Sequence, residues 1–331
     1  MTQAPILPDK LPHVYIALPA RPGENISLEL AVALQKESQG EGFKLWGWRA
    51  TPCSLLTTNF NHQWVLARNL RTAWLKGYAA CRQGVKRSAN PVAERAYGGE
   101  WYSGWDEAAG MVGPGPLTDW IMVHSDVAPI ALDSKPMRWI QDAVEERRRA
   151  KADVLSAVIP LKDDSGKTST AVMNWQTKNM RPLCLEECLP PNVPETFSIA
   201  SLAHGNEDVR RNGGDCLLIN TGYWIADLAG AWTRRICFRI YDTIIMGDDG
   251  YDEAQAVGED YLFSMDLYRL GLRVCATTKF TCNHAGTWKW PNYVAYGKGE
   301  RDKWGQPWCV EPPLHWNYMT AVPPRQESSV A

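Results

Sequence analysis

The sequence contains no apolar run long enough to cross a membrane. A membrane-spanning helix needs about 20 consecutive apolar residues, and no stretch approaches that length. Residues 1–5 (MTQAP) also lack the basic and apolar regions of a signal peptide. We therefore expect a cytoplasmic protein with no membrane partner.

A strong charge of one sign is absent as well. The formal net charge is -2, which gives no general attraction to nucleic acid, although a local basic groove stays open. The run 145–151 (EERRRAK) would end a helix expected at 136–151. A solvated helix face is the favoured interpretation of this run, and a phosphate-binding patch is the alternative.

The nine cysteines form no framework, because their odd number and scattered spacing fit a reducing compartment better than a set of disulfides. Cys184 and Cys188 are four residues apart and would share one helix face. No second pair with zinc-site spacing accompanies them, so we interpret them as structural thiols. The chain also shows no internal repeat.

Apolar residues suffice for a full core, since 331 residues with 45% hydrophobic content can form one large domain, alone or with an appendage. The most informative stretch is 119–129 (DWIMVHSDVAP), where a short apolar run ends in a polar triplet and a proline. This pattern predicts a buried strand with Asp126 at its carboxyl end, the edge at which open α/β sheets bind ligands. Alternatively, Asp126 only caps the following turn.

Two later segments carry further chemistry. Glu259 and Asp260 open an expected helix that Gly271 stops. The helix dipole favours ionised acids there, so Asp260 would be a weak but permanently available base, although acids at helix starts are also routine caps. A strand at 272–278 follows, and His284 comes after it; a lone histidine in that position is more often structural than a ligand.

The order of these features resembles the nucleotide-sugar-dependent glycosyltransferases of the GT-A fold, most closely the small phage-encoded ones. The resemblance runs from His13 to Thr287. Asp126 matches the last acid of the family's D-x-D motif, His124 replaces the first acid, and His284 matches the family's late histidine. Glu259 and Asp260 match the family's E-D pair. The fold implied is α/β, with a Rossmann-like mixed central sheet flanked by helices.

The resemblance also implies roles. A divalent metal, Mn²⁺ or Mg²⁺, would bind the donor diphosphate through Asp126 and His284, with His124 as a further ligand. Asp260 would act as the general base on an acceptor hydroxyl, with Glu259 as orienter or second candidate. The donor would be a nucleotide sugar, with UDP favoured, and transfer would invert the anomeric centre. A retaining reaction stays open.

The amino-terminal half fits the same family. We expect a first strand at 13–20 that breaks into a proline-bounded loop, a helix at 27–37, a strand at 43–48 and a helix beginning at 64. The resemblance places five residues against the donor: Pro19, Arg21, Arg68, Asn69 and Ser125. Arg68 is suited to phosphate and Asn69 to a base or ribose, although Arg68 also fits a solvated helix position.

The expected domains are a catalytic domain at 11–287 and a Trp- and Pro-rich arm at 288–331 that packs back on it, with disorder from Pro323. Within the domain, 78–117 is an insertion rich in glycine and aromatic residues, which we interpret as an ordered lid or acceptor platform. Cleavage near Gly113 should then slow when donor and metal bind. Three tryptophans would contact the acceptor: Trp101, Trp105 and Trp224, of which Trp224 equally suits the core.

The acceptor is less constrained by the sequence. The likeness to phage enzymes favours a hydroxymethylated pyrimidine in DNA, modified in the host cytoplasm, while a protein or glycan acceptor stays open. A nucleotidyltransferase is a second possibility, but only Arg21-Pro22-Gly23 represents the glycine-rich basic loop that it needs. The 16 tryptophans also suit a non-catalytic sugar-binding module. The donor sugar and the oligomeric state are not determined by the sequence.

Overall fold

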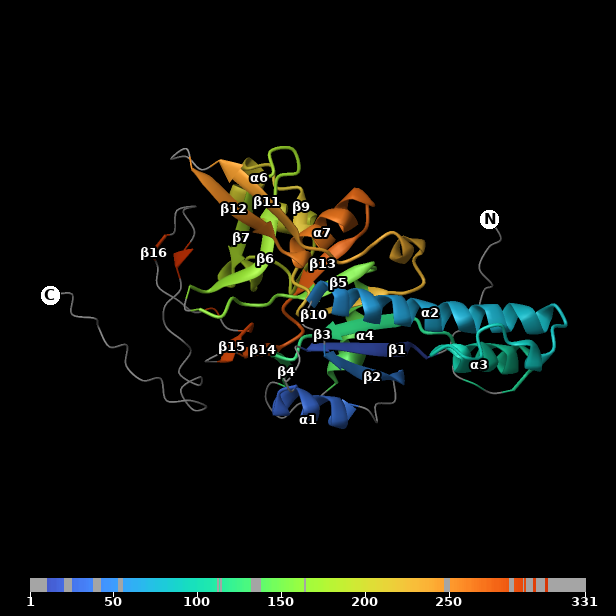
Figure 1. The fold of residues 1–331 in the computed structure, drawn as a ribbon. Helices are drawn as coiled ribbons and strands as arrows, with labels where there is room; N and C mark the ends of the chain where they lie inside the picture. The colour runs from blue at the N-terminus through green and yellow to red at the C-terminus, as the bar shows by residue number, and fades with distance from the viewer. Residues whose placement is uncertain are drawn as a thin grey trace.

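A seven-stranded sheet forms the centre of the molecule in the computed structural model (Figure 1). The structure describes residues 11–20, 26–37, 43–52, 56–111, 113, 115–131, 138–163, 165–246, 251–285, 289–293, 295, 300–301 and 307–308. The strand order is β2-β1-β3-β10-β5-β13-β8. In chain order these strands are β1 (His13–Ala20), β2 (Lys44–Pro52), β3 (Asp119–Val123), β5 (Val154–Ala157), β8 (Thr196–Phe197), β10 (Tyr223–Asp227) and β13 (Val274–Thr277).

The sheet is mixed because one central strand is reversed. β1 pairs in parallel with β2 and β3, and β5 pairs in parallel with β13. β10 lies between β3 and β5 and is antiparallel to both. The carboxyl ends of β1, β3, β5 and β13 therefore share one edge of the sheet, where β10 begins.

Helices cover both faces of the sheet and bury alternate side chains of its strands, which gives a Rossmann-like α/β fold. One face packs against α2 (Leu56–Arg82) and α7 (Glu259–Arg269). The opposite face packs against α1 (Leu28–Glu37) and α4 (Trp139–Arg149). On β3, for example, Trp120 and Met122 contact the first layer while Ile121 and Val123 contact the second.

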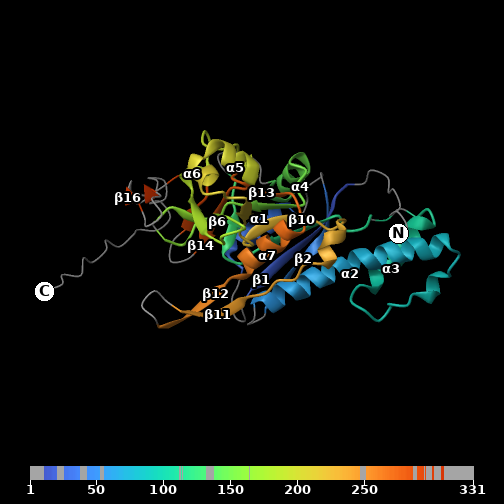
Figure 2. The same ribbon diagram turned by 90° about the horizontal axis from the view of Figure 1, so that it is seen from above.

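Smaller sheets and helices surround the central one. The three-stranded sheets are β7-β6-β9 and β15-β14-β4, and β11 with β12 forms a hairpin that extends from the body (Figure 2). Their strands are β4 (Val127–Pro129), β6 (Lys167–Met173), β7 (Met180–Cys184), β9 (Cys216–Leu218), β11 (Tyr241–Met246), β12 (Asp252–Val257), β14 (Cys282–Ala285) and β15 (Lys289–Pro291). The remaining elements are η1 (Arg87–Ala89), η2 (Glu186–Cys188), α5 (Ile199–Gly205), α6 (Glu207–Arg211), η3 (Ala231–Arg234), β16 (Glu300–Arg301) and β17 (Pro307–Trp308).

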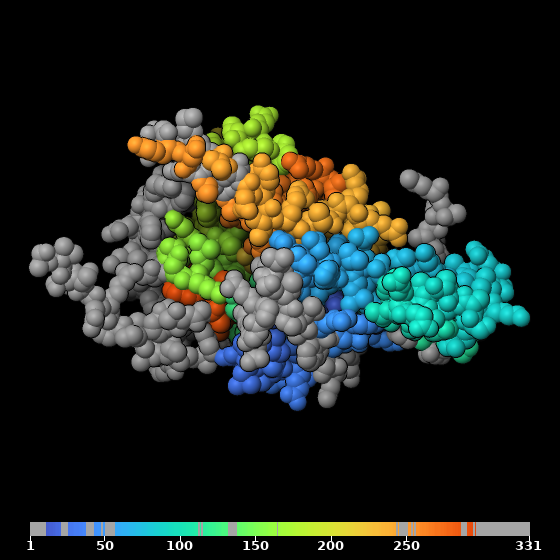
Figure 3. All heavy atoms as spheres, viewed as in Figure 1, coloured from blue at the N-terminus to red at the C-terminus, as the bar shows by residue number. Residues whose placement is uncertain are grey.

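The insertion 78–117 forms an antiparallel helical hairpin with the end of α2. Its helix α3 (Gly98–Ala108) packs on α2 through two glycines that let the backbones approach closely. A Cβ atom on Gly77 would lie 1.9 Å from the Trp101 carbonyl oxygen, and one on Gly104 would lie 1.9 Å from the Trp74 carbonyl oxygen. In atomic detail, α3 and the end of α2 form a knob on one side of the body (Figure 3).

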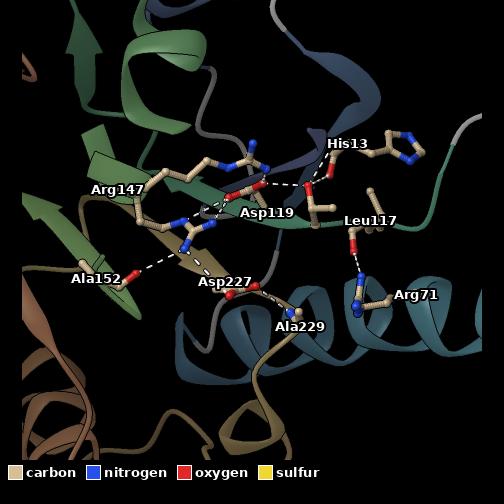
Figure 4. A network of polar contacts seen from close by, with 10 residues as sticks. His13, Arg71, Leu117, Asp119, Arg147, Ala152, Asp227 and Ala229 are labelled. Carbon is tan, nitrogen blue, oxygen red and sulfur yellow. Dashed lines mark hydrogen bonds and ion pairs between the residues drawn. The ribbon is translucent and has the colours of Figure 1, made fainter. Parts of the chain in front are cut away.

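A buried ion pair joins α4 to the amino-terminal edge of the sheet (Figure 4). Arg147 donates through Nε and Nη2 to Asp119 Oδ1 at 3.0 and 2.7 Å, and the Asp119 side chain has no exposed surface. Thr118 donates its hydroxyl to Asp119 Oδ2 at 2.7 Å. Arg147 Nη1 also reaches the Ala152 carbonyl oxygen at 3.2 Å and Asp227 Oδ2 at 3.9 Å. The network fixes the start of β3 and the end of β10.

Most elements expected from the sequence are confirmed, including a helix that begins with Glu259 and ends before Gly271, which has a φ of 66°. Two expectations were wrong. Cys184 ends a strand and Cys188 lies in a 3-10 turn, so the two thiols share no helix face. The helix expected to begin at 64 begins at Leu56. Most of the arm at 288–331 lies outside the described residues.

Candidate active site

Five separate parts of the chain meet at the carboxyl edge of the central sheet. They are the end of β3 with its following turn, the segment after β5, the turn before β10, the start of α7, and β14, which pairs with β4. Their polar residues are Asp126, Lys162, Asn220, Thr221, Asp260 and His284. This is the edge at which open α/β sheets bind ligands.

Asp126 lies in this edge as an ionised carboxylate. Its Oδ2 atom lies 2.5 Å from Lys162 Nζ and 3.6 Å from His284 Nε2. Burial on its own would raise the pKa of Asp126, but the contacts with His284 and Lys162 outweigh it and hold the pKa well below its usual range. Asp126 Oδ1 is buried and accepts no hydrogen bond within the described part of the chain.

His284 is held in place from two sides. Its Nδ1 atom lies 2.8 Å from the Pro160 carbonyl oxygen, so this nitrogen carries the proton and Nε2 faces Asp126. β14 also pairs with β4, and the Ala285 amide donates to the Asp126 carbonyl oxygen at 2.6 Å. The sequence-based expectation that His284 and Asp126 lie together agrees with this geometry.

Asp260 is the first-turn acid of α7 that contacts the turn before β10. Asn220 Nδ2 donates to its Oδ2 at 3.0 Å, and the Thr221 amide donates to its Oδ1 at 3.2 Å. The Thr221 hydroxyl donates to Oδ1 as well. Burial, followed by the neighbouring Glu259 carboxylate, raises the pKa of Asp260 to about 7 despite these bonds.

This pKa corrects the sequence-based expectation for Asp260. A helix start alone would favour the ionised carboxylate, but desolvation outweighs the helix dipole here. The residue as a whole is partly exposed at the edge of the sheet, whereas its carboxyl group is desolvated. A carboxylate with a pKa near neutrality is a stronger base than an ordinary aspartate.

The turn before β10 connects the two acids. The His124 amide donates to the Gly222 carbonyl oxygen at 2.8 Å, and Asp126 follows His124 by two residues. On the other side, Ser156 of β5 donates its hydroxyl to the Asn220 carbonyl oxygen at 2.6 Å. Backbone contacts thus hold Asp126 and Asp260 on opposite sides of one rigid turn.

The predicted metal ligands fit a protein-held metal ion poorly. Within the described residues, no three histidine, cysteine or acidic side chains gather as a metal site. His124 has its ring 5.2 Å from the Phe60 ring, and the Asp126 oxygen nearest His284 contacts the Lys162 ammonium. We therefore derive no catalytic step through a metal ion, and the divalent metal stays a prediction.

The predicted donor residues lie in different places. Pro19 is buried near the end of β1, and Ser125 is buried with its carbonyl oxygen accepting from the Ser27 amide at 3.2 Å. Both therefore border the carboxyl edge. Arg68 lies on α2 near Arg234; burial, and then this second arginine, lower the pKa of Arg68. Asn69 follows Arg68 on α2 and is partly buried, and Arg21 lies outside the described residues.

The structure does not place the predicted acceptor tryptophans around the site. Trp224 has no exposed surface and packs against Trp64, Trp120 and Phe263 in the core. Trp101 is 2% exposed between α2 and α3. Trp105 lies on α3 too and donates its indole N–H to the Val85 carbonyl oxygen at 2.8 Å, so it belongs to the helical hairpin.

The hairpin itself lies beside the amino-terminal edge of the sheet. His13, which begins β1, contacts the Gly115 carbonyl oxygen at 2.8 Å, and Arg71 of α2 donates to the Leu117 carbonyl oxygen at 2.5 Å. Figures 1 and 2 both show α3 at the opposite end of the molecule from β14. Because the insertion extends away from Asp126, we do not propose it as a lid over the site.

Sequence reasoning missed three of the site residues. Lys162 stands 36 positions after Asp126, in a segment that carried no motif. Asn220 and Thr221 were noted only as part of a strand and turn. Their residue types offered one signal, because Asn-Thr-Gly is a turn sequence between two apolar runs.

A cavity of about 1000 Å³ lies elsewhere, between α4 and the connection from β13 to β14. Its described lining includes Arg138, Glu146, Lys279 and Tyr293, and none of the residues around Asp126 or Asp260. The carboxyl-edge site is therefore defined by its convergent polar groups rather than by this cavity.

Comparison with known proteins gives distant likenesses in structure alone. No protein-family model and no curated protein sequence matches the chain. Among solved structures, A197 from STIV is similar with a TM-score of 0.37 and 12% identity, over 83% of this chain and 86% of that chain. A "putative UDP-N-acetylglucosamine pyrophosphorylase from Entamoeba histolytica" has a TM-score of 0.32 and 7% identity, over 80% of this chain and 73% of that chain.

Among the described residues, no helix combines the length and the apolar character that a bilayer span requires.

Proposed function

We propose that this protein is a nucleotide-sugar-dependent glycosyltransferase that moves a sugar to an acceptor hydroxyl. The observation that carries the proposal is the convergence of Asp126, Asp260 and His284 at the carboxyl edge of the sheet. Asp126 lies more than a hundred positions before Asp260 and His284 in the sequence. The β10 turn holds Asp260, and the pairing of β14 with β4 brings His284 to Asp126. Their order along the chain is the one on which the family resemblance rests.

Asp260 is proposed as the general base. Its carboxylate would accept the proton of the acceptor hydroxyl while that oxygen attacks the anomeric carbon. The bond from that carbon to the diphosphate oxygen breaks at the same time, and the bonding electrons leave with the nucleoside diphosphate. Attack from the face opposite the leaving group inverts the anomeric centre. Thr221 and Asn220 hold the carboxylate in one orientation for this transfer.

The leaving diphosphate gains negative charge, which a cation in the site must balance. The resemblance implies a divalent metal on Asp126 and His284 as this cation, but the residues present fit a protein-held metal ion poorly. Asp126 Oδ1, which is buried and accepts no bond among the described residues, is suited to a hydroxyl of the donor sugar or ribose. Glu259 would keep the pKa of Asp260 high through its negative charge.

The acceptor proposed from the structure differs from the hydroxymethylated DNA favoured by the sequence. The β11–β12 hairpin leads directly into Asp260 and exposes the carboxylates of Asp242 and Asp252 together with the ring of Tyr241. Acidic side chains repel a DNA backbone, whereas acidic and aromatic groups suit the hydroxyls and apolar faces of sugars. A glycan or glycosylated protein acceptor is therefore favoured, and hydroxymethylated DNA remains the alternative.

Nucleotide binding and turnover test the function. Calorimetry with UDP and GDP, each with Mn²⁺ and with EDTA, should show binding of one nucleotide, and a panel of its sugar conjugates should then show transfer. Asp260→Asn should abolish transfer but keep nucleotide binding within about twofold, because the base touches the acceptor hydroxyl and not the nucleotide. Asp208→Asn, the same change at the start of α6, should retain transfer.

Two outcomes would redirect the assignment. Transfer at the wild-type rate in Asp260→Asn would remove Asp260 as the base. Release of pyrophosphate from a nucleoside triphosphate and a sugar 1-phosphate would identify a nucleotidyltransferase instead.

A further inference from the structure

The strongest contact at the predicted metal position is made by a lysine. Lys162 Nζ lies 2.5 Å from Asp126 Oδ2, the oxygen that also faces His284 Nε2 at 3.6 Å. The ammonium thus contacts the carboxylate oxygen that the resemblance assigns to a metal ion. A divalent ion bound to the same oxygen would repel the ammonium at close range.

The segment that carries Lys162 is a fixed turn rather than a free surface loop. Pro160 forms a bridge with Thr168, and the Leu161 amide donates to the Lys167 carbonyl oxygen at 2.8 Å. Within the turn, the Ser165 amide donates to Asp163 Oδ1 at 2.9 Å. The Pro160 carbonyl oxygen is the group that orients His284, so the same segment positions both side chains.

The ammonium also has capacity for a ligand. An ammonium group has three N–H donors, of which Asp126 takes one. The Lys162 side chain is 37% exposed, so part of it is accessible to solvent at the carboxyl edge of the sheet. Beside it, Asp126 Oδ1 is a buried acceptor with no partner among the described residues. Donors for phosphate and an acceptor for hydroxyl therefore lie next to each other.

We propose that the Lys162 ammonium, rather than a divalent metal, is the cation that binds the donor diphosphate in this site. Asp126 acts as the positioning residue that holds the ammonium at the carboxyl edge, and His284 contacts the same carboxylate oxygen. This inference rests on the proposed glycosyltransferase function and names the source of positive charge for the leaving group. It makes nucleotide binding independent of metal and dependent on Lys162.

Calorimetric titration of UDP and GDP into the purified full-length protein, in EDTA and in Mn²⁺, tests the proposal. The wild type should bind one nucleotide in EDTA, with an affinity that Mn²⁺ changes less than about twofold. Lys162→Gln should weaken this binding by about 10- to 100-fold, the effect of losing a hydrogen bond to a charged group. Lys162→Arg should retain most of the affinity, because it keeps the charge and the N–H donors.

The matched control is Lys86→Gln, which removes one positive charge from an exposed position beside η1 in the helical hairpin. It should bind nucleotide as the wild type does. Circular dichroism and thermal unfolding show whether Lys162→Gln folds. A direct Mn²⁺ titration of the wild type, followed by electron paramagnetic resonance, needs no variant and should show no tight Mn²⁺ binding at the Asp126 site.

The possible results separate the two proposals. Binding that disappears in EDTA, returns with Mn²⁺ and is unchanged in Lys162→Gln would overturn the role of Lys162 and leave the transferase intact. Tight Mn²⁺ binding by the wild type that is lost in Asp126→Ala would overturn it as well. Absence of binding by either nucleotide, with and without metal, would overturn the proposed function itself.

Discussion

Removal of the Asp119 carboxylate is expected to destabilise the protein strongly. In Asp119→Ala, Arg147 loses two hydrogen bonds and its closest counter-charge while its side chain stays 9% exposed. Removing one partner of a buried ion pair generally costs about 3–5 kcal/mol, because the other charge stays buried without compensation.

The structure points to the lower end of that range. Arg147 keeps its bond to the Ala152 carbonyl oxygen at 3.2 Å and its contact with Asp227 at 3.9 Å, so part of its charge stays compensated. We therefore expect a loss of about 3 kcal/mol. An unfolding entropy of about 2.1 cal/mol/K per residue gives about 0.7 kcal/mol/K for the 331-residue chain, so the midpoint should fall by about 4 °C.

Urea denaturation and calorimetry measure the loss. Asp106→Ala is the matched control, because Asp106 forms a similar paired contact with Arg87 whose side chain is 51% exposed, and it should cost less than about 1 kcal/mol. The double variant Asp119→Leu/Arg147→Met should recover most of the loss, since no charge is then left buried. A cost below about 1 kcal/mol for Asp119→Ala, with an unchanged denaturant slope, would refute the reasoning.

Four other measurements test the structure. Gly104→Ala should lower the unfolding free energy by about 1–3 kcal/mol or more, because its Cβ would lie 1.9 Å from the Trp74 carbonyl oxygen. In the control Gly99→Ala, on the same helix, the new Cβ meets nothing within 4 Å, so this variant should be neutral or stabilised. Thermal unfolding of the two variants measures the difference. The raised pKa of Asp260 means that the folded state binds more protons than the unfolded state between the ordinary aspartate value of 3.8 and about 7, so the contribution of Asp260 to stability should fall as the pH rises through this window. Denaturation across pH should show this dependence reduced in Asp260→Asn. The transfer rate should rise with pH through about 7 as the base ionises, and a flat profile would argue against it. Proteolytic cleavage near Gly113 should proceed at the same rate with and without nucleotide. Slower cleavage in the presence of nucleotide would support the interpretation of the insertion as a lid.

Local patterns in the sequence were sufficient to predict most of the helices and strands and to place Asp126 at the ligand-binding edge of the sheet. The apolar run before His124 predicted β3, and the acids before an apolar period of helical spacing predicted α7. Strand ends of parallel strands share an edge, so Asp126 could be placed at a ligand-binding edge without tertiary information. The pairing of Asp126 with His284 followed from the family resemblance.

Tertiary contacts determined the rest. Lys162 reaches Asp126 only because a turn after β5 folds back over the edge, and periodicity carries no information on that approach. Trp224 is buried in the core because helices cover both faces of the sheet. A strand buried on both faces shows no alternation of apolar and polar residues, so the sequence does not distinguish buried from exposed side chains there. The pKa of Asp260 depends on desolvation by residues distant in sequence. Its position at the start of a helix alone therefore predicted an ionised carboxylate, which was wrong.

The reversed strand β10 has a consequence for synthesis of the chain on the ribosome. β10 joins the β2-β1-β3 group to β5, yet its residues emerge after all four of those strands. Until Tyr223–Asp227 has left the exit tunnel, β3 and β5 have unpaired edges that invite contacts with other chains. The nascent chain is therefore most exposed to aggregation between the synthesis of β5 and that of β10, which is the interval in which chaperone binding would matter most.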